Sequence, residues 1–91
     1  MRSPLDFFRK PELVIEPLKV QDCDAMARLH DESFSRPWND GEFRSLLSQP
    51  PVFGFIARPQ GMSDRPAGFI LSRLAAGEAE ILTVAVARSA R

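Results

Sequence analysis

The sequence has little that would support several large classes of function. One cysteine, Cys23, and one histidine, His30, cannot supply a tetrahedral metal site, and a single thiol excludes an internal disulfide. The 12 basic and 12 acidic residues give a formal net charge of zero, so there is no electrostatic basis for binding nucleic acid or a membrane surface. No apolar run approaches the roughly 20 residues of a membrane-spanning helix, and the N-terminus has no secretory signal. These absences favour a soluble, cytoplasmic protein.

The remaining composition is that of one small domain. The 91 residues are 44% apolar and 26% charged. A chain of this size hides only about 60–65% of its unfolded surface, so its stability is sensitive to any missing packing partner. Residues 1–11 lack a sustained hydrophobic period and end at Pro11. We therefore predict an N-terminal arm at residues 1–11 and a domain at residues 12–91.

Short segments rich in β-forming residues predict four strands, at residues 13–15, 52–57, 67–74 and 79–86. A loop containing proline, glycine and aspartate separates the second strand from the third, and Ala75-Ala76-Gly77 forms a short turn before the fourth. Such short connections favour an antiparallel meander. The run 79–86 is almost continuously apolar, which predicts a strand buried on both faces.

An amphipathic helix is predicted between the first and second strands. It begins after Asp22, a residue type that caps helix N-termini. One apolar face repeats at three- and four-residue spacing: Cys23, Met26, Ala27, His30 and Phe34. On this face we expect Cys23 to be a small buried residue and His30 to be a hydrogen-bonded residue at the edge of the core.

A second helix is predicted directly after the proline that ends the first. Asn39 and Glu42 have the spacing of a capping box, and Trp38 and Phe43 occupy the two positions of a hydrophobic staple. Two consecutive prolines, Pro50-Pro51, end this helix. The predicted order is β-α-α-β-β-β, an α+β fold with two helices on one face of an antiparallel sheet.

Two segments of the sequence resemble the GCN5-related N-acetyltransferases (GNAT). Residues 79–86, Ala-Glu-Ile-Leu-Thr-Val-Ala-Val, are similar to the central strand of that superfamily. Residues 29–43, which contain a proline-tryptophan pair followed by Phe43, are most similar to its ribosomal-protein-alanine N-acetyltransferases. The resemblance covers residues 12–91 and implies the N-terminal half of the GNAT fold. It also implies acetyl-CoA as co-substrate and a protein N-terminal amine, such as that of a ribosomal protein, as acceptor.

The same resemblance implies where the co-substrate binds. In the family, the central strand leaves backbone groups free to pair with the pantetheine arm, which would make Val84, Ala85 and Val86 binding residues. Arg91 matches the first residue of the loop that cradles the pyrophosphate, and the glycines of that loop would follow it. The alternative is that Arg91 is a frayed terminal residue rather than a ligand. We expect residues 1–91 to be inactive as a transferase on their own.

Three side chains are implied in catalysis and acceptor binding. Glu80 matches the general base of the histone acetyltransferases of this superfamily, whereas in the ribosomal-protein-alanine group the base lies on the following strand. The alternative is that Glu80 is a solvent-facing carboxylate at a strand end. Trp38 and Phe43 match the loop that borders the acceptor-peptide groove, although capping of the second helix alone accounts for both.

Two other interpretations remain beside a fragment of an acetyltransferase. In the first, the chain is a catalytically inactive remnant. In the second, it is a small α/β interaction module that binds a partner through its exposed last strand. Residues 81–86 have high β-propensity and neither charge nor proline, and Thr83 is their one polar side chain. We therefore expect the chain to self-associate through the open edge of this strand.

Overall fold

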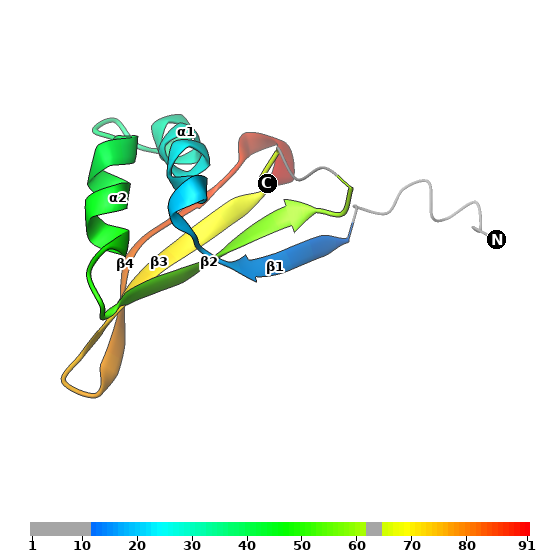
Figure 1. The fold of residues 1–91 in the computed structure, drawn as a ribbon. Coiled ribbons are helices and arrows are strands. Elements are labelled where there is room, and N and C mark those ends of the chain that lie inside the picture. The colour runs from blue at the N-terminus through cyan, green and yellow to red at the C-terminus, as the bar shows by residue number, and fades with distance from the viewer. Residues whose placement is uncertain (1–11, 62–64) are drawn as a thin grey trace, which may run out of the picture.

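The computed structural model describes residues 12–61 and 65–91. The elements follow in the order β1 (Leu13–Pro17), a 3-10 turn η2 (Val20–Asp22), α1 (Cys23–Ser33), α2 (Asp40–Leu47), β2 (Val52–Pro59), β3 (Gly68–Ala75), β4 (Glu78–Val86) and a 3-10 turn η3 (Arg88–Ala90). The predicted order β-α-α-β-β-β is confirmed (Figure 1). The predicted N-terminal arm lies outside the described residues.

The four strands form one antiparallel sheet in sequence order, β1-β2-β3-β4, which confirms the predicted meander. Helices α1 and α2 both lie over the same face of this sheet (Figure 1). Between helices and sheet lies the core, whose largest fully buried side chains are Phe43, Met26, Ile56, Leu71 and Cys23. The α+β architecture expected from the periodicity is therefore the observed one.

The first helix begins where expected, but its capping differs from the prediction. Asp22 is the N-cap residue by position, yet its side chain makes no capping hydrogen bond to α1. The carboxylate instead accepts from the backbone N–H of Lys19 at 2.9 Å and pairs with Arg58 Nη2 at 2.6 Å. Phe34, predicted on the buried face, follows the end of α1 and is exposed.

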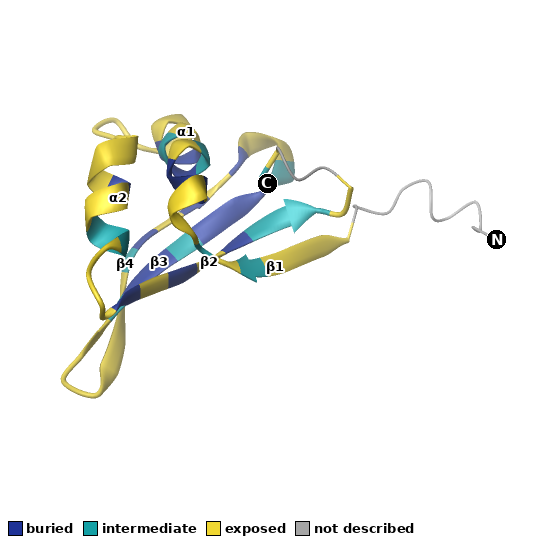
Figure 2. Cartoon of the chain, in the orientation of Figure 1, coloured by how far each residue is buried: buried dark blue, intermediate teal, exposed yellow. Residues whose placement is uncertain are grey.

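Strand β4 is buried on one face rather than on both, so this prediction was wrong. Thr83 and Ala85 are buried beneath the helices, whereas Ile81 is 65% exposed and Val84 is 50% exposed. Residues 78–81 lie in a β3–β4 hairpin that extends beyond the helices (Figure 2). The helices cover one face of the sheet only. The apolar side chains of β4 that point to the other face therefore stay exposed to solvent. Among the described residues, neither α1 nor α2 has the length and hydrophobicity of a membrane span.

Candidate cofactor and substrate site

The last residues of β4 present backbone groups at an outer edge of the sheet. The N–H of Ala87 donates to the carbonyl of Ala67 at 2.7 Å, so residue 87 faces the β3 side. Along an antiparallel ladder this orientation alternates, which directs the backbone groups of Val84 and Val86 outward and those of Ala85 toward β3. Of the three implied pantetheine-binding residues, Val84 and Val86 therefore offer backbone groups at this edge.

A β-bulge interrupts β4 just before that edge. The register passes from Leu71↔Thr83 to Ser72↔Ile81, so Leu82 has no partner on β3. The extra residue turns two consecutive side chains toward the helices: Leu82 packs against the core, and Thr83 is buried. Nothing in the apolar run 79–86 distinguishes Leu82 from its neighbours, so the bulge was missed in the sequence.

Two arginines connect the end of β4 to the end of α1. Arg88 Nη2 donates to the carbonyl of Glu32 at 3.1 Å, and Arg91 Nη2 donates to Ser33 Oγ at 2.6 Å. Arg91 Nε also donates to the carbonyl of Val86 at 3.1 Å. The Arg91 side chain is therefore held by two elements, α1 and β4, rather than frayed. Both cations lie where the negative end of the α1 dipole favours them.

His30 links α1, the loop before α2 and β4. Its Nδ1 accepts a hydrogen bond from the backbone N–H of Trp38 at 3.0 Å, so Nδ1 carries no proton. Nε2 then holds the proton and donates to Thr83 Oγ1, also at 3.0 Å. Burial lowers the pKa of His30, and Glu42 acts in the opposite direction. The predicted hydrogen-bonded core histidine is confirmed, and Thr83, expected at an open edge, is its buried partner.

Aromatic rings surround His30 on the side of the helices. Trp38 and Phe34 stack on the imidazole with ring centroids 5.1 Å and 4.0 Å away, and Phe43 meets it edge-on at 5.3 Å. Trp38 and Phe43 also contact each other, with centroids 5.6 Å apart, as the hydrophobic staple requires. Phe34 is the C-cap residue of α1 and follows His30 by four positions, and this spacing is the sequence signal for their stacking.

Glu80 lies in the exposed β3–β4 hairpin, on the helix-bearing face of the sheet and before the bulge in the sequence. Its Oε1 accepts from Nε of Arg73 at 2.8 Å and from Nη2 of the same residue, and Arg73 is its partner in the strand register. The Glu80 side chain is half-exposed. Four residues separate it from Val84, which is about 13 Å along a strand. For Glu80 to accept a proton from a group bound beside Val84, substrate or water would therefore have to bridge that distance.

The remaining reactive side chains are structural. Cys23 is fully buried, and burial raises the pKa of its thiol, so it packs as a neutral side chain as expected.

The buried pair of Asp22 and Arg58, 36 residues apart, was not predicted. Asp22 lies in η2 and Arg58 in β2, so the tertiary fold brings them together and no local pattern indicates this pair. Within residues 12–61 and 65–91, no three potential ligands gather into a metal site.

The fold of the described residues is a partial GNAT α+β fold. A structure similar to it is the crystal structure of the ribosomal-protein-S18-alanine N-acetyltransferase from Escherichia coli, with a TM-score of 0.73 and 20% sequence identity. The similarity covers 86% of this chain and 48% of that one, so the chain spans about half the length of the similar enzyme. No protein-family model matches the sequence. No curated protein matches it either.

Proposed function

We propose that this chain is the N-terminal half of an N-acetyltransferase that transfers an acetyl group from acetyl-CoA to a protein N-terminal amine. One observation supports this more than any other. The strand with the central-strand sequence, β4, lies at the sheet edge with outward backbone groups at Val84 and Val86, inside a fold with a TM-score of 0.73 to an enzyme of that activity. A ribosomal protein beginning with alanine is the proposed acceptor.

The β4 edge has the chemistry to hold the pantetheine arm of acetyl-CoA. That arm contains amides, which pair with outward N–H and C=O groups in the way that an added strand does. Arg91 now donates to the Val86 carbonyl and would have to release it to an incoming amide. Arg88 and Arg91 supply positive charge at the same end of the strand, suited to a pyrophosphate. Acetyl-CoA brings the acetyl thioester, and the chain positions it.

The acceptor amine must lose a proton before it attacks the thioester. We propose Glu80 as a candidate proton acceptor through water, with Arg73 fixing its orientation. Trp38, partly buried and stacked on His30, is proposed together with Phe43 to border the acceptor groove. The rival proposal is a non-catalytic interaction module, which the exposed apolar side chains of the sheet favour.

The binding part of this proposal is testable on residues 1–91. A titration with acetyl-CoA, followed by amide NMR, is expected to shift the signals of Val84 and Val86 far more than that of Ala85. The expected affinity is weak because the chain spans only 48% of the similar enzyme. Pantetheine without the nucleotide serves as the control and should shift the same amides. Unchanged Val84 and Val86 signals at saturating acetyl-CoA would contradict the proposed site.

A further inference from the structure

The buried side chain of His30 contacts both segments that the proposed site uses. Its Nδ1 accepts from the backbone N–H of Trp38 at 3.0 Å, and its Nε2 lies 3.0 Å from Thr83 Oγ1. Trp38 lies in the loop proposed to border the acceptor groove. Thr83 directly precedes Val84, whose outward backbone groups are proposed to pair with pantetheine. One imidazole therefore connects the acceptor side of the proposed site to its cofactor side.

The environment of this imidazole is supplied by the described residues themselves. His30 is 2% exposed, and aromatic rings surround it with centroids 4.0 to 6.5 Å away: Phe34, Trp38, Phe43 and Phe69. Its surroundings therefore do not depend on the half of the similar enzyme that this chain does not span. A polar ring among aromatic neighbours is costly unless its nitrogens are bonded, and both are. The two bonds thus point to a role beyond filling the core.

The two hydrogen bonds of His30 depend on each other. Because Nδ1 accepts, the one proton of the neutral ring lies on Nε2 and is donated to Thr83. Without the Thr83 hydroxyl, this proton loses its acceptor. Transfer of the proton to Nδ1 would remove that cost but would also remove the acceptor of the Trp38 N–H. A change at Thr83 is therefore transmitted to Trp38 through the ring.

The bond to His30 also fixes the direction of β4 at the proposed cofactor edge. Leu82, which has no partner on β3, interrupts the strand pairing directly before Thr83. His30 holds the Thr83 side chain toward the helices, so the next side chain, Val84, points to the other face. Rotation of Thr83 away from His30 would change the direction of the backbone groups that Val84 offers.

We infer that His30 is a positioning residue that keeps the loop at Trp38 and the strand at Val84 in one relative position and transmits a change in one to the other. The loop and the strand take their roles from the proposed function, on which this inference rests, whereas the bonds of His30 exist without it. Binding of acetyl-CoA at Val84 is thereby expected to alter the loop that borders the acceptor groove.

Amide hydrogen exchange of residues 1–91, measured by NMR without ligand, tests the coupling. Thr83→Val removes the hydroxyl and should speed exchange of the Trp38 amide about fivefold, the equivalent of one hydrogen bond. Thr83→Ser keeps a hydroxyl and is the matched control. The Leu18 amide donates to the Gly54 carbonyl at 2.9 Å, a bond that involves neither α2 nor β4, and serves as the internal reference.

A double-mutant cycle determines whether this effect passes through His30. His30→Asn keeps an acceptor near the position of Nδ1 but does not reach Thr83, so in this background Thr83→Val should change Trp38 exchange less than about twofold. An unchanged Trp38 amide in Thr83→Val, equal acceleration at Leu18, or a fivefold effect that persists in His30→Asn would each overturn the inference. The wild type alone decides it as well, because ring nitrogen signals that place the proton on Nδ1 would also overturn it.

Titration with acetyl-CoA separates this inference from the proposed function. The wild type should show shifted amide signals at Val84, Val86 and Trp38, and His30→Asn should lose the shift at Trp38 alone. Shifts at Val84 and Val86 without one at Trp38 would overturn the role of His30 and leave the transferase proposal standing. Unshifted Val84 and Val86 signals would contradict the cofactor site, and the ligand-free cycle would still decide the coupling.

Discussion

At the scale of single residues, His30 is held by hydrogen bonds from two sides and by stacked aromatic rings. Two hydrogen bonds of opposite direction, from Trp38 to Nδ1 and from Nε2 to Thr83, fix one neutral tautomer. A second proton on the ring would remove the acceptor for the Trp38 N–H and leave a buried donor without a partner. The residue therefore holds the α1–α2 loop to β4 only while it is uncharged.

This arrangement predicts a pH-dependent stability. Burial lowers the pKa of His30 below its ordinary value of 6.5, so the unfolded chain binds a proton at a higher pH than the folded chain does. The His30 contribution is therefore complete above pH 6.5 and is lost as the pH falls from there toward the lowered pKa. Urea denaturation at several pH values should show this decline. His30→Phe should remove that part of the dependence, and an unchanged slope in this variant would contradict the prediction.

Glu80 offers a second prediction at this scale. As half of an exposed ion pair it should contribute at most about 1 kcal/mol to stability, so Glu80→Gln should leave the fold intact. If it is the proton acceptor in a longer, active form, the same change should lower kcat/KM by about 10²–10⁴-fold. Arg73→Gln is the matched control, because it breaks the same ion pair and keeps the carboxylate. A loss below about threefold for Glu80→Gln would assign Glu80 to structure.

At the scale of elements, the start of α2 is the best-specified local structure. The N–H of Glu42 donates to Asn39 Oδ1 at 2.9 Å, and the N–H of Asn39 donates to Glu42 Oε1 at 3.2 Å. Both arms of the predicted capping box are therefore confirmed. Because the cap and the Trp38–Phe43 staple act on the same turn, they set the direction in which α2 leaves the loop beside His30.

Removal of this cap should destabilise the fold measurably. Asn39→Ala leaves the Glu42 N–H without its acceptor and should cost about 1 kcal/mol of unfolding free energy. Asn39→Asp keeps an acceptor at the same place and serves as the control. Thermal unfolding of the three proteins checks the prediction, and equal transition temperatures for Asn39→Ala and the wild type would contradict it.

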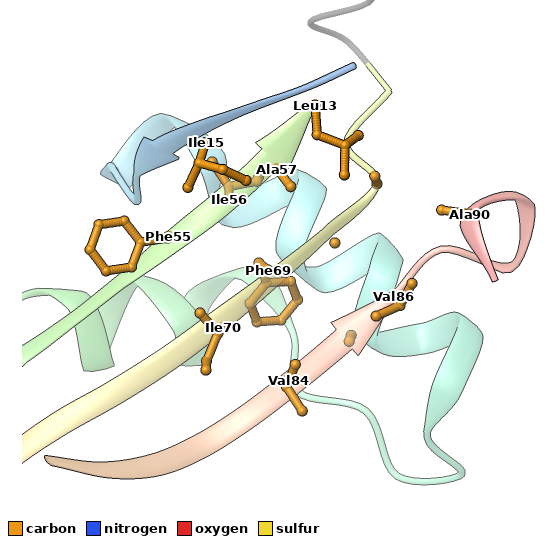
Figure 3. A pocket seen from close by; sticks show the side chains of 13 residues that line it. Leu13, Ile15, Phe55, Ile56, Ala57, Phe69, Ile70, Val84, Val86 and Ala90 are labelled. Carbon is orange, nitrogen blue, oxygen red and sulfur yellow. The ribbon is translucent and has the colours of Figure 1, made fainter. Parts of the chain in front are cut away.

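At the scale of the whole molecule, the two faces of the sheet differ in the side chains they carry. The helix-bearing face holds the core and the charged side chains of the strands, while the opposite face carries exposed apolar side chains such as Phe55 and Val84, which Figure 3 labels. A domain of this size has little stability to spare for such exposure. The opposite face is therefore a surface that a further apolar layer would cover.

The transferase proposal makes a prediction at the same scale. Residues 1–91 alone should not acetylate a peptide beginning with alanine, because the similar enzyme is about twice as long and the chain spans 48% of it. An assay of free CoA release, with a full-length acetyltransferase as positive control, should stay at background. Sustained turnover by purified residues 1–91 would show that the described half is sufficient for chemistry.

The sequence by itself determined the elements of this protein. The order of helices and strands, the capping box at Asn39 and the staple at Trp38 and Phe43 depend on residues within a few positions of each other. Local propensity and spacing specify such features directly, and the resemblance of two short segments added the GNAT fold, which the structural similarity confirms.

The tertiary structure alone decided which side chains of these elements contact one another. It placed Thr83 against His30, Arg58 against Asp22 and Arg91 against Ser33, all pairs far apart in the chain. It also left one face of β4 uncovered, although the sequence of that strand indicates burial on both faces. Register, bulges and the covering of a face depend on packing between distant segments, and no local pattern carries that information.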